Sequence, residues 1–146
     1  MRQEIIKKFA DFCSNGHTPL SLQKLLKDNC ESLNFTEDHM KWFNKYLHRI
    51  RDIVRSESGY QTMLGFKNNT THTAYSLKKI YKKDSHTSYA RWLLKLEEIK
   101  LLCRYDQEDG LEEWGKKKIY ALNPEQKKIA KLILDIIWQV HFTTSI

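Results

Sequence analysis

Hydroxyl and basic side chains recur at one-turn spacing between residues 87 and 95. Thr87 and Ser88 precede Arg91 by four and three residues, and Lys95 follows Arg91 by four. Residues three or four apart share a face of an α-helix, so these side chains would project on one side. A guanidinium can donate two hydrogen bonds to a guanine edge, and an ammonium suits a phosphate oxygen. The pattern predicts a polyanion-binding surface in which Arg91 contacts bases and Lys95 a phosphate.

Positive charge is concentrated around the same residues. The chain has 25 Lys and Arg against 18 Asp and Glu, a net charge of +7 in 146 residues. A basic chain favours nucleic acid, an anionic membrane surface or an acidic protein partner. Residues 67–104 hold nine of the basic residues and three acids, so they carry +6 of the excess. We interpret this concentration as a means of neutralising phosphates.

The candidate contacts share either a positive charge or a place at the predicted helix start. Backbone amides at a helix N-terminus also favour phosphate oxygens, so hydroxyl residues there are included. The candidate DNA contacts are Ser85, Thr87, Ser88, Arg91, Lys95, Lys78, Lys79, Lys82, Lys116, Lys117 and Lys118.

Other chemistries find little support in the sequence. Cys13, Cys30 and Cys103 are widely spaced, without a CxxC pair, and the six histidines are dispersed. No Gly-rich phosphate loop and no GxSxG motif is present. We therefore expect no catalytic residue, no metal and no cofactor. An enzyme with an unrecognised site remains a further alternative.

The location of the protein is also predicted from its composition. No apolar run approaches the ~20 residues that cross a bilayer, and the N-terminus is too charged for a signal peptide. An odd number of scattered cysteines is typical of reduced thiols inside the cell. We expect a cytoplasmic protein with no membrane partner.

Hydrophobic periodicity predicts several helices before the basic region. A helix is expected over 3–14, a short one after a capping Ser21, and a long one over 36–56 capped by Thr36. Residues 60–67, "YQTMLGFK", are read as a short strand or extended arm. Residues 74–83, "AYSLKKIYKK", are expected to form another short helix.

The helix that carries Arg91 is predicted to run from Thr87 to about Leu101. Its apolar side, which would rest on the scaffold, contains Tyr89, Leu93 and Leu96, with Leu94 as a further candidate. The segments "LLCRYDQ" and "KKKIYALN" then alternate as in a two-stranded hairpin. The final helix begins at "NPEQ", with Asn123 as N-cap and Pro124 at the first helical position.

Residues 76–123 resemble the winged helix-turn-helix family. The resemblance lies in "SLKKIYKKDSHTSYARWLLKLEEIKLL" followed by "CRYDQEDGLEEWGKKKIYALN", roughly a third of the chain. The second helix of that family commonly ends in LxxLExxGL before the wing strands. Leu93, Leu96, Glu97 and Leu101 match this motif, whereas Lys100 stands where the family has glycine.

This resemblance implies a fold and a function. The fold class is mostly α with a small β-hairpin: residues 1–35 as a helical N-terminal arm, 36–122 as the winged-helix unit and 123–146 as a C-terminal packing or dimerisation helix. The implied function is sequence-specific double-stranded DNA binding without catalysis, in transcriptional regulation. A plasmid or phage replication or partition factor is an alternative, because close relatives in the family have those roles.

The last helix has two interpretations. Its aliphatic stripe must be buried, either on the N-terminal helices or against the same helix of a second copy. The stripe is Ile129, Leu132, Ile133, Ile136, Ile137 and Val140, widened by Leu134, Trp138 and Phe142. A twofold dimer would read a two-part site, so a homodimer through this helix is favoured.

A second hypothesis belongs to a different class of function. The tip of the expected wing is acidic and would be repelled by phosphates. Its acids are Asp106, Glu108, Asp109, Glu112 and Glu113. With 17 aromatic residues in the chain, a protein–protein adaptor of winged-helix shape is the alternative.

Overall fold

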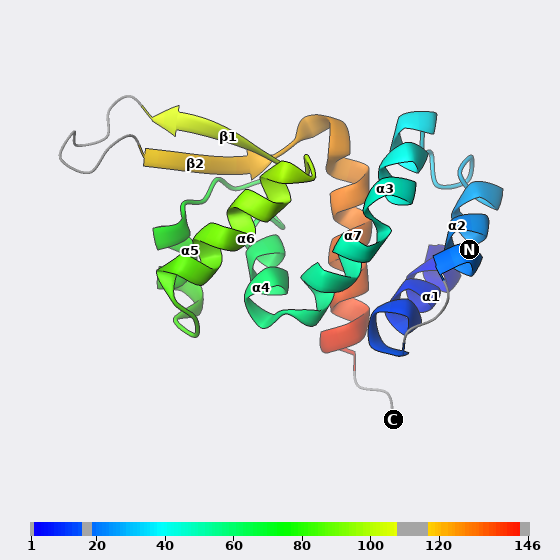
Figure 1. Cartoon of the computed structure of the whole chain (residues 1–146), viewed down its shortest axis with the longest axis horizontal. Helices are drawn as coiled ribbons and strands as arrows, with labels where there is room; N and C mark the ends of the chain where they lie inside the picture. The colour runs from blue at the N-terminus through cyan, green and yellow to red at the C-terminus, as the bar shows by residue number, and fades with distance from the viewer. Residues whose placement is uncertain (1, 16–18, 108–116, 144–146) are drawn as a thin grey trace. The chain divides into compact units, whose positions relative to one another are not determined.

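The computed structural model describes residues 2–15, 19–107 and 117–143, and most of these residues are helical (Figure 1). One antiparallel two-stranded sheet accompanies the helices. The elements are α1 (Arg2–Asn15), α2 (Pro19–Asp28), α3 (Glu37–Arg55), α4 (Glu57–Gly65), α5 (Ala74–Tyr81), α6 (His86–Glu98), β1 (Leu102–Gln107), β2 (Lys117–Leu122), a 3-10 turn (Pro124–Gln126) and α7 (Lys127–His141). The predicted mostly α fold with a small hairpin is therefore confirmed.

The chain divides into two compact units. We call Met1–Tyr60 together with Lys131–Ile146 the helical unit, and Gln61–Ala130 the hairpin unit. The divisions fall within α4 and α7. These units differ from the expected segments 1–35, 36–122 and 123–146, because the long helix α3 belongs to the helical unit. The predicted DNA-reading helix α6 and both strands belong to the hairpin unit.

The core of the helical unit is built from aromatic and aliphatic side chains. Helices α1, α2 and α3 pack on one another (Figure 1). The rings of Phe9 and Phe35 lie 6.0 and 5.4 Å from that of Phe43. Within the helical unit, the predicted stripe of α7 is buried at Leu132, Ile133, Ile136 and Ile137, while Val140 is half-buried. Ile129, which belongs to the hairpin unit, is buried as well. The chain itself therefore buries the aliphatic side of its last helix.

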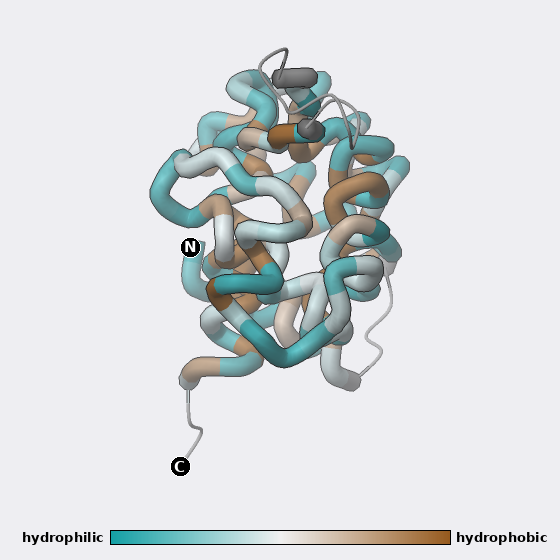
Figure 2. Tube along the Cα trace, turned by 90° about the vertical axis from the view of Figure 1, so that its left-hand side faces the viewer, coloured by the Kyte–Doolittle hydropathy of each residue, from teal (hydrophilic) through white to brown (hydrophobic). Residues whose placement is uncertain are grey.

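Hydrophobic residues are interspersed with hydrophilic ones along the helices rather than gathered into one long run (Figure 2). This is the pattern of helices with one buried side and one solvated side. Within the described ranges, no helix has the length and apolar character needed to cross a membrane.

Two local predictions about the helices are wrong. The segment 60–67 is not a strand, because Glu57–Gly65 is helical. Met63 and Phe66 are both fully buried and three residues apart, which is a helical spacing that a period-two reading misses. Ser21 does not cap the second helix, which begins at Pro19. Proline suits a first turn because its missing N–H would have no partner there.

Two predicted helix starts are confirmed. The Thr36 hydroxyl accepts a hydrogen bond from the His39 amide at 3.2 Å, and His39 Nδ1 accepts one from the Thr36 amide at 3.0 Å. This reciprocal cap satisfies two amides that the helix leaves unpaired. The Asn123 side chain accepts from the Glu125 amide at 3.2 Å, with Pro124 in the first turn.

The hairpin is extended at one point by a residue from outside it. Strands β1 and β2 pair antiparallel from Leu102 opposite Leu122 to Gln107 opposite Lys117. Tyr120, on β2, also exchanges two backbone hydrogen bonds with His72, at 3.0 and 2.9 Å. His72 therefore occupies a third strand position, in the segment between α4 and α5.

Candidate nucleic-acid interface

Helix α6 has one buried side and one exposed side, as its sequence predicts. Tyr89, Leu93 and Leu96 have at most 1% of their surface exposed. Thr87, Arg91 and Lys95 are exposed, and Ser88 is half-buried beside them. Helix α5 packs against α6 (Figure 1). The arrangement holds a hydroxyl, a guanidinium and an ammonium on the outer surface of a fixed helix.

The start of α6 is closed by its own hydroxyl groups. Ser85 Oγ accepts a hydrogen bond from the Ser88 amide at 3.2 Å and lies 3.1 Å from Ser88 Oγ. Asp84 Oδ1 accepts from the Ser85 amide at 2.8 Å. The Ser85 side chain is thus an N-cap, and the exposed Thr87 follows it in the first turn.

The lysines of α5 do not share one environment. Lys79 and Lys82 are exposed, whereas Lys78 is half-buried. Lys78 Nζ donates a 2.8 Å hydrogen bond to the backbone carbonyl of Asp84, in the turn between α5 and α6. Lys82, which ends α5, has a left-handed backbone with φ of 58°. Lys78 therefore braces the turn, while the other two lysines are open to solvent.

The end of α6 has a left-handed backbone at Lys100, the position at which the sequence resemblance expected a glycine. Lys100 has φ of 67°, the left-handed region that favours glycine. The Lys100 amide donates to Glu97 O at 2.9 Å, and the Leu101 amide donates to Leu96 O at 3.0 Å. These two bonds form the Schellman motif that ends helices. The backbone adopts the glycine geometry although the residue is lysine.

Lys95 is oriented by an aromatic neighbour. Its ammonium lies 4.5 Å from the centre of the Trp92 ring, and Trp92 is half-buried. A cation over an indole face is attracted by the ring's negative face. This contact draws the Lys95 ammonium toward the Trp92 side of α6.

The buried side of α6 carries one polar anchor. Tyr89 Oη donates a 2.7 Å hydrogen bond to Gln61 Oε1, and both residues are buried. The Tyr81 ring stacks on Tyr89 with a centroid separation of 6.2 Å. Burial, and secondly the neighbouring Tyr89, raise the pKa of the Tyr81 hydroxyl. A buried, directed hydrogen bond fixes the rotation of α6 about its axis more strictly than apolar contacts do.

His72 joins three parts of the hairpin unit. Its Nε2 lies 2.7 Å from Gly65 O at the end of α4, and its Nδ1 lies 3.1 Å from Ser76 Oγ in α5. Its backbone pairs with Tyr120 of β2. The sequence reading assigned His72 no role, because its partners come from separate segments.

Fewer of the candidate DNA contacts in the hairpin lie within the described residues. Lys118 is exposed, and Lys117 is the first residue of β2. Lys116 and the acids of residues 108–113 lie outside the described residues. Arg104 of β1 lies 3.5 Å from Glu97 of α6, so this cation is partly offset by an acid of the same surface.

Three exposed residues of α6, His86, Leu94 and Glu98, were not among the predicted contacts. Leu94, which the sequence suggested as a possible inward residue, is 46% exposed. Glu98 is exposed one turn further along. The helical spacing from Thr87 to Arg91, Leu94 and Glu98 is four, three and four, and this signal could have placed the last two on the outer stripe.

Within the part of the chain that the structure describes, no three His, Cys, Asp or Glu residues gather where they could hold a metal ion. A comparison of the chain with family models, curated proteins and solved structures found no match.

Proposed function

We propose that the hairpin unit is a winged helix-turn-helix module that binds double-stranded DNA in a sequence-specific manner. The observation that carries this proposal is the exposed stripe of α6, on which Thr87, Arg91 and Lys95 stand opposite a fully buried apolar side. The B-DNA major groove is about 12 Å wide and admits such a helix. Arg91 reads a base edge there, and Lys95 contacts a phosphate.

The order of the elements supports the same proposal. Helix α4, the bridging residue His72, helices α5 and α6, and strands β1 and β2 follow one another in the hairpin unit. The resemblance covers the two helices and the hairpin over residues 76–123, whereas the short strand and the long helix before them were expected from the patterns of residues 60–67 and 36–56. The strand position is reduced to His72, and the first helix is α4 rather than the long helix of residues 36–56.

The net charge of the hairpin unit also supports the proposal of DNA binding. The hairpin unit, residues 61–130, contains 14 Lys and Arg and nine Asp and Glu, a net +5 of the chain's +7. Lys79, Lys82 and Lys118 are exposed and stand as phosphate contacts. Transcriptional regulation is the role we propose, and replication or partition of a plasmid or phage would use the same surface.

Salt dependence of binding tests the proposal. In a fluorescence-anisotropy titration with a random 20-bp duplex, affinity should fall steeply with salt, by about 0.9 log units per log unit for each phosphate contacted. Lys95→Ala should lower that slope by about 0.9, and Arg91→Ala should weaken binding at every salt concentration used. Lys41→Ala is the charge-matched control, because Lys41 is exposed on α3 outside this surface. Unchanged affinity in both α6 variants would reject the mechanism.

A protein–protein adaptor is the second candidate function. Tyr75 and Ile80 of α5 are 68% and 55% exposed, so α5 presents two apolar side chains that a protein partner would cover. An adaptor would show no appreciable affinity for duplex DNA at ~100 mM salt. The same titration therefore separates the two candidates.

We also propose a homodimer through the outer side of α7. Trp138 and Phe142 are 52% and 47% exposed, and their rings stack at 5.1 Å. The aliphatic side of α7 is already buried inside the chain, so the proposed dimer would use the aromatic side that contains Trp138 and Phe142. Light scattering of the wild type and of Trp138→Lys tests the assignment. A monomeric wild type at 100 μM would reject it.

A further inference from the structure

We propose that Leu94 reads the C5-methyl group of a thymine next to the base pair that Arg91 contacts. This inference rests on the proposed DNA-binding function and adds the base that the groove surface selects. It starts from an exposed leucine in the middle of a surface whose other outward residues are polar or charged.

The core does not require Leu94. Its neighbours Leu93 and Leu96 are 1% and 0% exposed and make the packing contacts of α6, while Leu94 is 46% exposed. Single exposed leucines are common on protein surfaces, so exposure alone carries no function. Leu94 lies three residues after Arg91 on the exposed side of the helix that is proposed to enter the groove, and there an exposed apolar side chain would meet the bases.

The spacing of the helix places Leu94 beside Arg91. Residues three apart are neighbours on the helix surface, and they are separated by about 4.5 Å along the axis. Base pairs are stacked about 3.4 Å apart. A helix whose Arg91 reaches a guanine edge therefore brings Leu94 to a position one or two base pairs away.

The Lys95 side chain does not cover the position that Leu94 would occupy beside the bases. Its ammonium is drawn to the ring of Trp92, which lies on the opposite side of Lys95 from Leu94 around the helix. The exposed Glu98 lies one turn beyond, where phosphates would repel it, so the contact stretch ends near Lys95. Leu94 is then the last side chain that faces the bases.

Thymine is the base that suits this side chain. In the major groove, only the A·T pair presents a methyl group, and apolar side chains contact it. Burying one methyl group against an apolar side chain favours binding by about fourfold. A leucine in that place also disfavours pairs that present an amino group there without a partner.

The experiment uses the full chain and DNA that differs by one methyl group. Enriched duplexes are selected from a random pool, and each thymine is then replaced by uracil, which lacks only the methyl. Affinities are measured for the wild type, Leu94→Ala and the polar Leu94→Asn, with thermal melting to verify folding. One or two uracil positions should weaken the wild type about fourfold and leave both variants unaffected.

The other outcomes are distinguishable. Uracil substitution without effect on the wild type, or an equal effect in Leu94→Ala, overturns the Leu94 assignment while DNA binding stands. Salt-dependent binding without any enriched sequence also overturns it. Absence of binding to every duplex removes the proposed function and this inference with it.

Discussion

Lys78 Nζ donates a 2.8 Å hydrogen bond to the carbonyl of Asp84, six residues along the chain. The bond spans the turn that joins α5 to α6. It assigns a basic residue of the candidate interface to an internal contact rather than to a phosphate. The neighbouring Lys79 has the same charge and is exposed. The pair therefore allows a structural lysine to be compared with one that we propose contacts DNA.

Lys78→Ala should lower stability, because the Asp84 carbonyl loses a charged donor in a half-buried turn. We expect a loss of about 1 kcal/mol in the free energy of unfolding, measured by urea denaturation. The salt slope of DNA binding should not change. Lys79→Ala should show the reverse, with wild-type stability and a slope lower by about 0.9. A reduced slope in Lys78→Ala would mean that its ammonium contacts a phosphate.

Lys100→Gly should stabilise the chain. A non-glycine residue at φ of 67° pays a steric cost that glycine does not, so the gain should be about 1 kcal/mol. Lys100→Ala is the matched control, because alanine removes the charge but keeps the strain. Equal stability of the two variants in thermal melting would contradict the helix end described here.

Gly65→Ala should destabilise the hairpin unit. A Cβ at Gly65 would lie 2.6 Å from Leu77 Cδ2, and Leu77 is fully buried. Overpacking of this kind costs about 1–3 kcal/mol. In a Leu77→Ala background the clash is absent, so Gly65→Ala should lower the free energy of unfolding only slightly. Additive losses in the double variant would show that Leu77 is not the obstacle.

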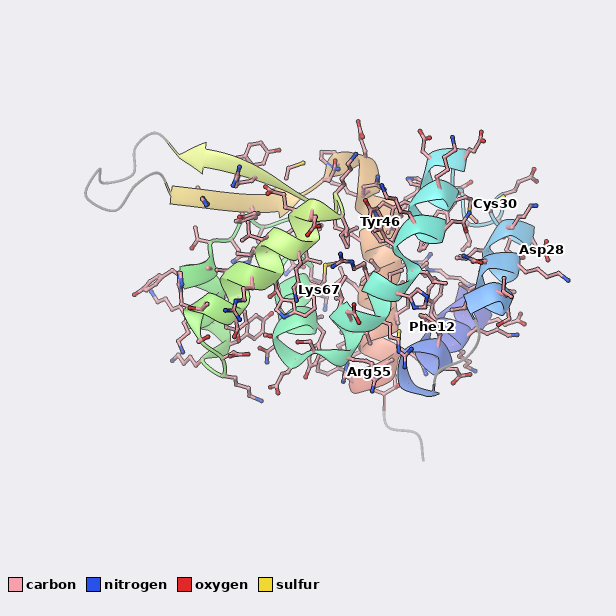
Figure 3. The ribbon with its side chains drawn as sticks, in the orientation of Figure 1. Phe12, Asp28, Cys30, Tyr46, Arg55 and Lys67 are labelled. Carbon is pink, nitrogen blue, oxygen red and sulfur yellow. The ribbon has the colours of Figure 1, made fainter. Side chains whose placement is uncertain are left out.

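Cys13 should make stability depend on alkaline pH. Burial raises the pKa of its thiol from the ordinary value of 9.0 to about 12, against smaller lowering effects of Arg51 and Arg55. Cys13 lies next to the labelled Phe12 on α1, and Arg55 ends α3 (Figure 3). The folded state holds this proton more tightly than the unfolded state. The contribution of the Cys13 thiol to the free energy of unfolding is therefore fully present below pH 9 and is lost as pH rises toward 12.

Urea denaturation between pH 8 and pH 10.5 measures this effect. Above pH 9 the thiol should contribute a decrease of up to about 1.4 kcal/mol per pH unit. Cys13→Ala lacks this thiol, so its stability should fall less steeply over the same range. Parallel curves for the two proteins would refute the burial of Cys13.

Much of α6 could be predicted from the sequence because its periodicity is strong. Tyr89, Leu93 and Leu96 recur at helical spacing and are buried, and the hairpin pattern after Leu101 also appears in the structure. The environment of Lys78 could not be predicted, since its partner depends on the path of the turn. The same is true of His72, whose three partners come from α4, α5 and β2.

The secondary structure of residues 60–67 was harder to predict. Residues 60–67 mix polar and apolar residues so that both periods fit, and burial of Met63 and Phe66 decides for the helix. Leu94 was ambiguous for a related reason. Leu94 follows Leu93 directly in the sequence. A helical-wheel plot places Leu94 on the outer side only when it is oriented by the residues that are buried in the structure.

The outer side of α6 is the surface that we propose meets DNA. The most direct measurement is a ¹H–¹⁵N NMR titration of the full chain with a duplex, following the backbone amides. Our account predicts that the largest shifts fall on residues 85–95, with smaller ones at Lys79, Lys82 and Lys118. Shifts concentrated on α3 or α7, with residues 85–95 unchanged, would contradict it.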